Sequence, residues 1–135
     1  MTYLLDTNIC IYIIKKKPIE VFEKFKEIAP GDIGISSITL AELQYGVAKS
    51  SSIQKNQDAL NKFIVPLKVF SFDYNATFHY GNIRTYLQKS GIVIGSLDML
   101  IAAHALSLSS ILVTNNVKEF ERVPDLEIEN WTNIN

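Results

Sequence analysis

The segment Tyr3–Asn8, with the sequence YLLDTN, decides how the rest of the chain is interpreted. Three apolar residues predict a short buried strand, Asp6 stands at its end, and the apolar-rich stretch from Thr7 to Ile14 predicts a helix. Strand-like and helix-like stretches continue to alternate along the chain. This alternation is typical of a parallel sheet covered by helices, so we expect an α/β fold, a three-layer sandwich with a central parallel sheet.

The remaining elements follow from apolar periodicity and from turn residues. Further strands are expected at 33–36, 68–72, 111–113 and 126–128. Helices are expected at 18–28, 39–48, 52–63, 73–90 and from 96 to about 108. Asp73 should cap the long helix that follows it, and Gly91 should end that helix.

The composition fits a folded chain, and we expect residues 1–135 to form a single domain. Hydrophobic residues make up 47% of the chain, which is enough for a full core. No apolar run reaches the ~18 residues of a membrane span, so no membrane partner is expected. The only cysteine, Cys10, excludes an internal disulfide and a multi-cysteine zinc site, and fits a reducing cytoplasm.

The charge balance excludes one way of binding nucleic acid. With 13 basic and 14 acidic residues the net charge is −1, which argues against a binder that relies on bulk positive charge. An enzyme that holds phosphates through metal ions and a local basic patch remains compatible with this balance.

Five polar residues are expected where apolar strands give way to helices. Parallel strands end at one edge of their sheet, and ligands of α/β proteins bind at this edge. Carboxylates gathered there would repel one another, and Mg²⁺ or Mn²⁺, which prefer carboxylate oxygens, would offset the repulsion. Two such ions ~3.5–4 Å apart could activate water for phosphodiester cleavage. The five residues are Asp6, Glu42, Asp98, Asn116 and Glu119.

Each acid also has a structural explanation. Asp6 could cap the first helix, and Thr39 could form a capping box with Glu42. Asp98 could complement a helix dipole, and Glu119 could be an ordinary exposed residue. The joint pattern favours a metal site, because helix caps do not need acids at the ends of several different strands.

Two other features have alternative interpretations. His104 lies on the apolar face of its helix, and a packed core position is favoured over a catalytic base. The apolar side chains of the early helices exceed what one small helical face buries, so they either pack in the core or form a groove for a partner helix. These side chains belong to Ile9, Tyr12, Ile13, Phe22 and Phe25.

Four motifs in order resemble the PIN-domain family, and their spacing is similar to that of the VapC toxins of bacterial toxin–antitoxin pairs. The resemblance runs from Leu4 to Trp131, nearly the whole chain. The motifs are LLDTN at 4–8, SITLAEL at 37–43 with Gly46, DMLIAAHA at 98–105, and LVTNN at 112–116 with Glu119 and Phe120.

The resemblance implies a small Mg²⁺- or Mn²⁺-dependent endoribonuclease. Asp6 and Asp98 would match the principal metal ligands of the family, and Glu42 its third acid. Many members carry Asp where this chain has Asn116, so either Glu119 supplies a fourth acid or a second metal binds weakly and mainly with substrate. Three further polar residues would support the metal and the phosphate: Thr7, Asn8 and Thr114.

The resemblance also implies partners. VapC-like toxins typically cut structured RNA, often tRNA, are held inactive by a cognate antitoxin, and commonly form homodimers. A housekeeping RNA-processing PIN nuclease is the alternative within the same class. A phospho-acceptor domain using Asp73 is disfavoured, because Asp6 is followed by Thr7 and Asn8 instead of a second acid. In addition, Val113 is followed directly by Thr114 and Asn115 instead of a lysine. A catalytically inactive binding module is disfavoured because Asp6, Glu42 and Asp98 are all present.

Overall fold

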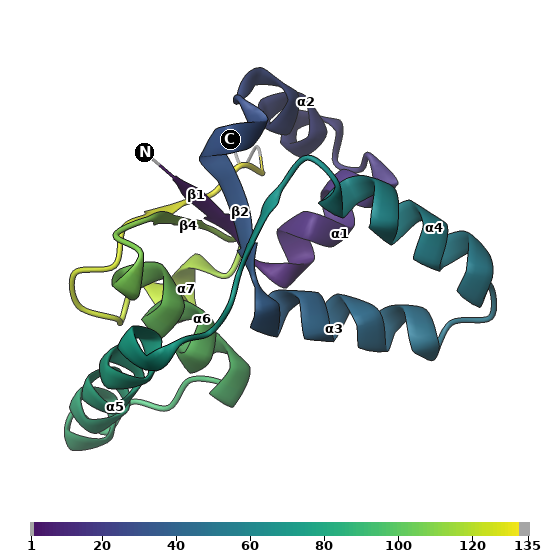
Figure 1. Cartoon of the computed structure of the whole chain (residues 1–135). Coiled ribbons are helices and arrows are strands. Elements are labelled where there is room, and N and C mark those ends of the chain that lie inside the picture. The colour runs from purple at the N-terminus through teal and green to yellow at the C-terminus, as the bar shows by residue number, and fades with distance from the viewer. Residues whose placement is uncertain (1, 133–135) are drawn as a thin grey trace.

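A parallel sheet forms the centre of the molecule in the computed structural model, which describes residues 2–132 (Figure 1). Its strand order is β3-β2-β1-β4-β5, and every neighbouring pair is parallel. The first strand of the chain therefore lies in the middle of the sheet. The strands of the described part are β1 (Tyr3–Leu5), β2 (Ile33–Ser36), β3 (Lys68–Phe70), β4 (Ile111–Val113) and β5 (Ile128–Glu129).

Helices cover both faces of this sheet, which confirms the three-layer α/β prediction. Helices α1–α4 pack together on one face, and α5–α7 lie on the other (Figure 1). Their bounds are α1 (Thr7–Lys15), α2 (Ile19–Glu27), α3 (Ser37–Ala48), α4 (Ile53–Ile64), α5 (Tyr74–Lys89), α6 (Ser96–Ser107) and α7 (Val117–Phe120). Among the described residues, none of these helices has the length and apolar character needed to cross a bilayer.

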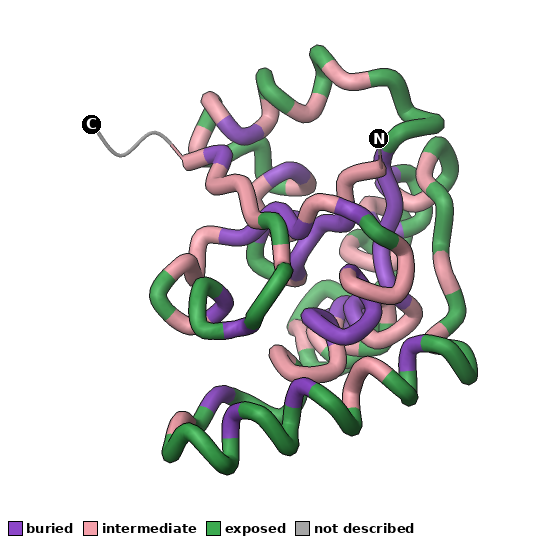
Figure 2. Tube along the Cα trace, turned by 90° about the vertical axis from the view of Figure 1, so that its left-hand side faces the viewer, coloured by how far each residue is buried: buried purple, intermediate pink, exposed green. Residues whose placement is uncertain are grey.

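The central strands β1 and β4 are apolar at consecutive positions because helices cover both faces of the sheet there. Leu4 points into the core beneath α5–α7, whereas Leu5 points into the core beneath α1–α4. Leu112 and Val113 of β4 repeat the same alternation, as the period of two in a strand requires. Buried residues concentrate in β1, β2, β4 and α6. Figure 2 shows the buried residues gathered toward the centre of the molecule, with exposed residues along the outer helices.

Several expected boundaries are confirmed, and others are shifted by one or two residues. Asp73 caps α5 by accepting a hydrogen bond from the Ala76 N–H at 3.1 Å, and Gly91 after this helix has a φ of +70°. Strand β3 ends at Phe70 rather than at 72, and β5 begins at Ile128 rather than at 126.

The proposed capping box of α3 is wrong. The helix begins at Ser37 instead of at Thr39, because the Ser36 hydroxyl caps it by accepting a hydrogen bond from the Ile38 N–H at 3.0 Å. Thr39 is instead buried within the first turn, and within the described part of the chain its hydroxyl has no hydrogen-bond partner. The carboxylate of Glu42 is therefore not used for capping and reaches another helix.

Candidate functional site

The carboxylate of Asp6 is fixed where the two central strands end. Asp6 follows β1 directly, and its backbone N–H donates to the carbonyl of Val113 in β4 at 2.9 Å. One carboxylate oxygen accepts from the Thr7 N–H at 2.7 Å, which caps α1, and the other accepts from the Thr114 hydroxyl at 2.8 Å. Asp6 is thus both a helix cap and a buried acid, with 6% of its surface exposed.

Glu42 lies one turn into α3 and turns toward the start of α1. Its Oε1 accepts a hydrogen bond from the Thr7 hydroxyl at 2.8 Å. Thr7 therefore contacts both acids, Asp6 through its backbone and Glu42 through its side chain. Asn8, the other polar residue expected here, is exposed in the first turn of α1.

Asp98 and Glu119 form the second half of the cluster. Asp98 stands in the first turn of α6, and its carboxyl group is hydrogen-bonded to that of Glu119. The expectation that Asp98 follows a strand is wrong: a loop of residues 92–95 precedes α6. This loop is held by Glu119, whose Oε1 accepts from the Gly95 N–H at 2.6 Å.

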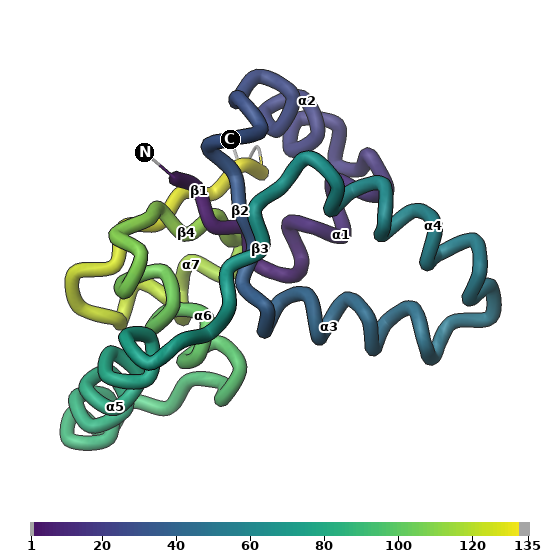
Figure 3. Tube along the Cα trace, in the orientation of Figure 1, coloured from purple at the N-terminus to yellow at the C-terminus, as the bar shows by residue number. Residues whose placement is uncertain are grey.

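Asn116 contacts Glu119 as well. Its Nδ2 donates to the second oxygen of Glu119 at 2.8 Å, and its backbone N–H donates to the Thr114 hydroxyl at 3.0 Å. Thr114 in turn donates to Asp6, so a continuous chain of hydrogen bonds runs from β1 to α7. Figure 3 shows the starts of α1 and α3 meeting the α6 region at this end of the sheet.

The four carboxylates act on one another electrostatically. Burial and the neighbouring acids raise the pKa of Asp98 to about 7. These neighbours are, in order of effect, Glu119, Asp6 and Glu42. Burial also raises the pKa of Asp6, whereas the Gly95 N–H lowers the pKa of Glu119. The site therefore concentrates negative charge beyond what its own hydrogen bonds offset.

This donor set fits a hard divalent cation. It consists of carboxylate oxygens with one amide, the ligand type that Mg²⁺ and Mn²⁺ prefer. Within residues 2–132, no three His, Cys, Asp or Glu side chains already surround a common metal position. Three of the acids accept hydrogen bonds from neighbouring groups: Asp6 from Thr114, Glu42 from Thr7 and Glu119 from Gly95.

A buried link behind the acids was not foreseen from the sequence. His104 of α6 is buried, as expected of a core residue, and its Nδ1 lies 2.8 Å from the hydroxyl of Ser36. The backbone of Ser71 is a further hydrogen-bond partner of the ring. Burial lowers the pKa of His104, which keeps the ring neutral in this arrangement. The link joins α6, which carries Asp98, to the N-terminus of α3, which carries Glu42.

A partly buried contact lies next to Thr114. The Asn115 Nδ2 donates to the Tyr12 hydroxyl at 3.0 Å, which ties β4 to α1. Tyr12 is therefore engaged within the molecule, whereas Tyr45 and Tyr86 are 66% and 48% exposed. Of these three tyrosines, Tyr45 and Tyr86 have exposed ring surface on which a base could stack.

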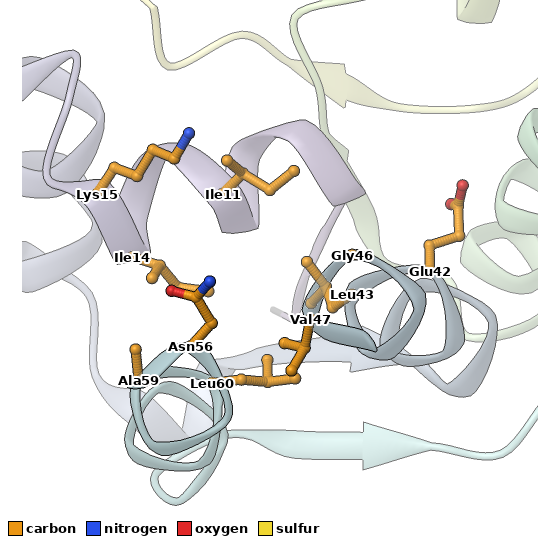
Figure 4. A pocket seen from close by; sticks show the side chains of 10 residues that line it. All are labelled: Ile11, Ile14, Lys15, Glu42, Leu43, Gly46, Val47, Asn56, Ala59 and Leu60. Carbon is orange, nitrogen blue, oxygen red and sulfur yellow. The ribbon is translucent and has the colours of Figure 1, made fainter. Parts of the chain in front are cut away.

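An apolar groove of about 280 Å³ begins at Glu42 and runs between α1, α3 and α4. Figure 4 shows Glu42 at one end of this groove, with Ile11, Ile14 and Lys15 of α1 along one wall. The opposite wall comes from α3 and α4, with Leu43 and Leu60 among its residues.

The groove is not lined by the side chains proposed from the sequence. Ile9 and Ile13 are buried in the core, and Tyr12, Phe22 and Phe25 pack against the same core. The lining residues of α1 occupy the other side of that helix. The helical period of 3.6 residues separates these two faces, and the sequence offered no sign of which one meets a neighbour.

Comparison with known proteins supports the fold and the motifs. Residues 3–126 match the PIN domain family model. Ribonuclease VapC2 of Rickettsia felis is 48% identical over 132 residues, covering 97% of this chain and 98% of that protein. The tRNA(fMet)-specific endonuclease VapC of Salmonella typhimurium is 43% identical over 131 residues, covering 97% of this chain and 98% of that protein.

A solved structure agrees with the sequence comparison. In the crystal structure of VapBC2 from Rickettsia felis bound to a promoter DNA fragment, one chain superimposes with a TM-score of 0.92 and 47% identity. The match covers 98% of this chain and all of that one. Because the family model and these relatives extend over nearly the whole sequence, the chain belongs to the PIN-domain family, and the relatives it resembles within that family are VapC ribonucleases.

Proposed function

We propose that this nuclease is a divalent-metal-dependent endoribonuclease that acts as the toxin of a toxin–antitoxin pair. The observation that carries the proposal is the cluster of four carboxylates at the carboxyl end of the central strands, where Asp98 has a pKa of about 7. Such mutual repulsion at an accessible edge is what a bound cation would relieve.

Asp6, Asp98 and Glu42 are the proposed ligands of Mg²⁺ or Mn²⁺. A divalent cation bound there supplies positive charge at the scissile phosphate and lowers the pKa of a coordinated water. The chain's own groups fix the ligands beforehand: Thr7 and Thr114 orient the carboxylate of Asp6, and Thr7 also orients Glu42.

Asn116 and Glu119 take different parts in this proposal. Both oxygens of Glu119 already accept hydrogen bonds, from Gly95 and from Asn116. Glu119 therefore positions the loop before α6 and, with it, Asp98. Asn116 donates through its nitrogen, so its carbonyl oxygen is the group that would face a cation.

The proposed substrate is structured RNA, with tRNA favoured. The Salmonella relative bears the name tRNA(fMet)-specific endonuclease, and its similarity extends over almost the full length of both chains. We place the reaction in the cytoplasm, where tRNA occurs and where the free, buried thiol of Cys10 is compatible with reducing conditions.

The proposed inhibitor is a cognate antitoxin. The matched structure is a VapBC2 complex, and the apolar groove between α1, α3 and α4 offers a seat for an apolar segment of such a partner. Because the groove begins at Glu42, a segment bound in it could place a Lys or Arg on the carboxylates. A homodimer is also proposed; α5 exposes 89% of Tyr74 and 63% of Phe78, which are available for a second copy.

Replacing Asp6 tests the proposal. Asp6→Asn should keep the fold, because Asn caps helices as well as Asp does. It should nearly abolish Mg²⁺-dependent RNA cleavage and relieve the growth arrest expected when the chain is expressed alone. Asp58→Asn, an exposed acid on α4, is the matched control and should change neither property.

Two results would contradict the proposal. Full cleavage by folded Asp6→Asn protein would remove Asp6 from the metal site. A harmless wild-type chain that accumulates as an active nuclease without a partner would replace the toxin role with RNA processing.

A further inference from the structure

A second cleft adjoins the acidic cluster, at Glu119 rather than at Glu42. It has a volume of about 310 Å³ and is lined by the loop of residues 93–95, by Asn116, and by Lys118, Glu119 and Arg122. This size reaches the lower end of the range of ligand clefts, roughly 300–1,000 Å³.

The walls of this cleft are firmly held. The Gly95 N–H and the Asn116 Nδ2 both donate to the carboxylate of Glu119, at 2.6 and 2.8 Å, so the loop and α7 are clamped together. Ile94 and Phe120 are buried beneath them, with 5% and 0% exposure. The cleft is therefore part of the folded structure and not a gap in a loose loop.

Two cationic side chains line the cleft. Lys118 and Arg122 are four residues apart along α7 and the turn after it, a spacing that places both on one side. Both are exposed. The positive charge of Arg122 lowers the pKa of Glu119, after the larger effects of the hydrogen bonds from Gly95, Asn116 and Asp98.

Several other cations of the chain are engaged elsewhere. Lys16 and Lys26 lie over the ring of Phe22, and Lys49 lies over Tyr45. Arg84 donates to the hydroxyl of Tyr80. With a net charge of −1, the chain cannot hold RNA by bulk charge, so the cations beside the acids matter most.

We propose that this cleft binds the phosphodiester backbone of the RNA next to the cleavage position, with Lys118 and Arg122 as its phosphate contacts. The inference rests on the proposed function. The carboxylates repel every phosphate that flanks the scissile one, and two cations at the rim of the cluster offset that repulsion. Val93, 86% exposed at the same cleft, gives apolar contact to the neighbouring ribose or base.

The test compares two charge-matched double variants. Lys118→Gln/Arg122→Gln removes the cleft cations, and Lys55→Gln/Lys62→Gln removes two exposed cations from α4, which lies over the other face of the sheet (Figure 1). Both are made on the Asp6→Asn background, and binding of labelled bulk tRNA is measured in Mg²⁺ over a range of salt concentrations.

We expect the cleft variant to bind about tenfold more weakly at low salt. Its slope of log affinity against log salt should fall by about 1.5, since each lost phosphate contact removes roughly 0.7–0.9. The α4 variant should stay within about twofold of its parent. With Asp6 restored, the cleft variant should raise KM about tenfold and keep kcat within about twofold.

Equal affinity and equal salt slope in the two double variants would overturn the proposal, and so would a fallen kcat with unchanged KM. Failure of the proposed function is recognised separately, because the wild-type chain would then cut no RNA in Mg²⁺.

Discussion

Removing the charge of Asp98 should stabilise the metal-free protein at alkaline pH. In the folded chain the pKa of Asp98 rises from 3.8 to about 7, first through burial and then through Glu119, Asp6 and Glu42. Ionising Asp98 therefore costs more in the folded than in the unfolded chain. The free energy of unfolding should fall as the pH rises from about 4 to about 7.

The magnitude follows from the pKa difference. A change from 3.8 to about 7 corresponds to about 4 kcal/mol. Asp98 is only half-buried, so water screens its interactions, and we expect about 2 kcal/mol. Glu119 does not disturb this pH window: its lowered pKa adds stability above its ordinary value of 4.5, and this stability is lost only at lower pH.

Urea unfolding in EDTA measures the effect. At pH 8, Asp98→Asn should be about 2 kcal/mol more stable than wild type, because the amide removes the charge and can still donate to Glu119. At pH 4 the two proteins should differ little. Mg²⁺ at pH 8 should then stabilise wild type more than the variant, since ligands that bind only the folded state raise its stability.

The control is Asp58→Asn, which should leave the pH profile of stability unchanged. The reasoning would be refuted if wild-type stability were flat between pH 5 and pH 8 in EDTA. It would also be refuted if Asp98→Asn were less stable than wild type at pH 8.

The remaining predictions concern the fourth ligand, the buried link and the sheet. Asn116→Asp should tighten Mn²⁺ binding in titration calorimetry and Glu119→Gln should change it little; the reverse result would make Glu119 the fourth ligand. His104→Leu should cost about 1–3 kcal/mol in urea unfolding for each buried polar group left unpaired. If the two side chains act as a pair, adding Ser36→Ala should cost only the lost cap of α3, about 0.5–2 kcal/mol. Gly34→Ala should lower the free energy of unfolding by about 1–3 kcal/mol, because the added Cβ would overlap the ring of Phe70. Gly81→Ala, which has open space in α5, should raise it by about 0.5–1 kcal/mol. Equal effects of the two substitutions would contradict the packing of β2 against β3.

The sequence predicted those elements whose signals are local. Short apolar runs such as 3–5 and 111–113 are the central strands, and Asp73 and Gly91 bound α5 as expected. The acids expected after such strands predicted a site at the carboxyl end of the sheet, where Asp6 lies. The match is good here because both faces of the sheet are buried and strand composition is then nearly uniform.

The sequence did not predict features that depend on contacts between residues far apart in the chain. Ser36 and Thr39 are both good capping residues, and Ser36 prevails because β2 pairs with β3 as far as Ser36 and the helix starts at once. The apolar loop before α6 is not a strand: Val93 is 86% exposed within it. Contacts such as Ser36 with His104 join positions far apart in the chain, and no local pattern marks them.

The position of β1 between β2 and β4 has a consequence for folding during synthesis. Asp6 and Glu42 are synthesised before Thr114, which holds Asp6, and before Glu119, which holds the loop that precedes Asp98. The centre of the sheet is therefore incomplete until β4, which pairs with β1, has been synthesised. A nascent chain that still lacks Thr114 and Glu119 therefore has only part of its acidic site in place.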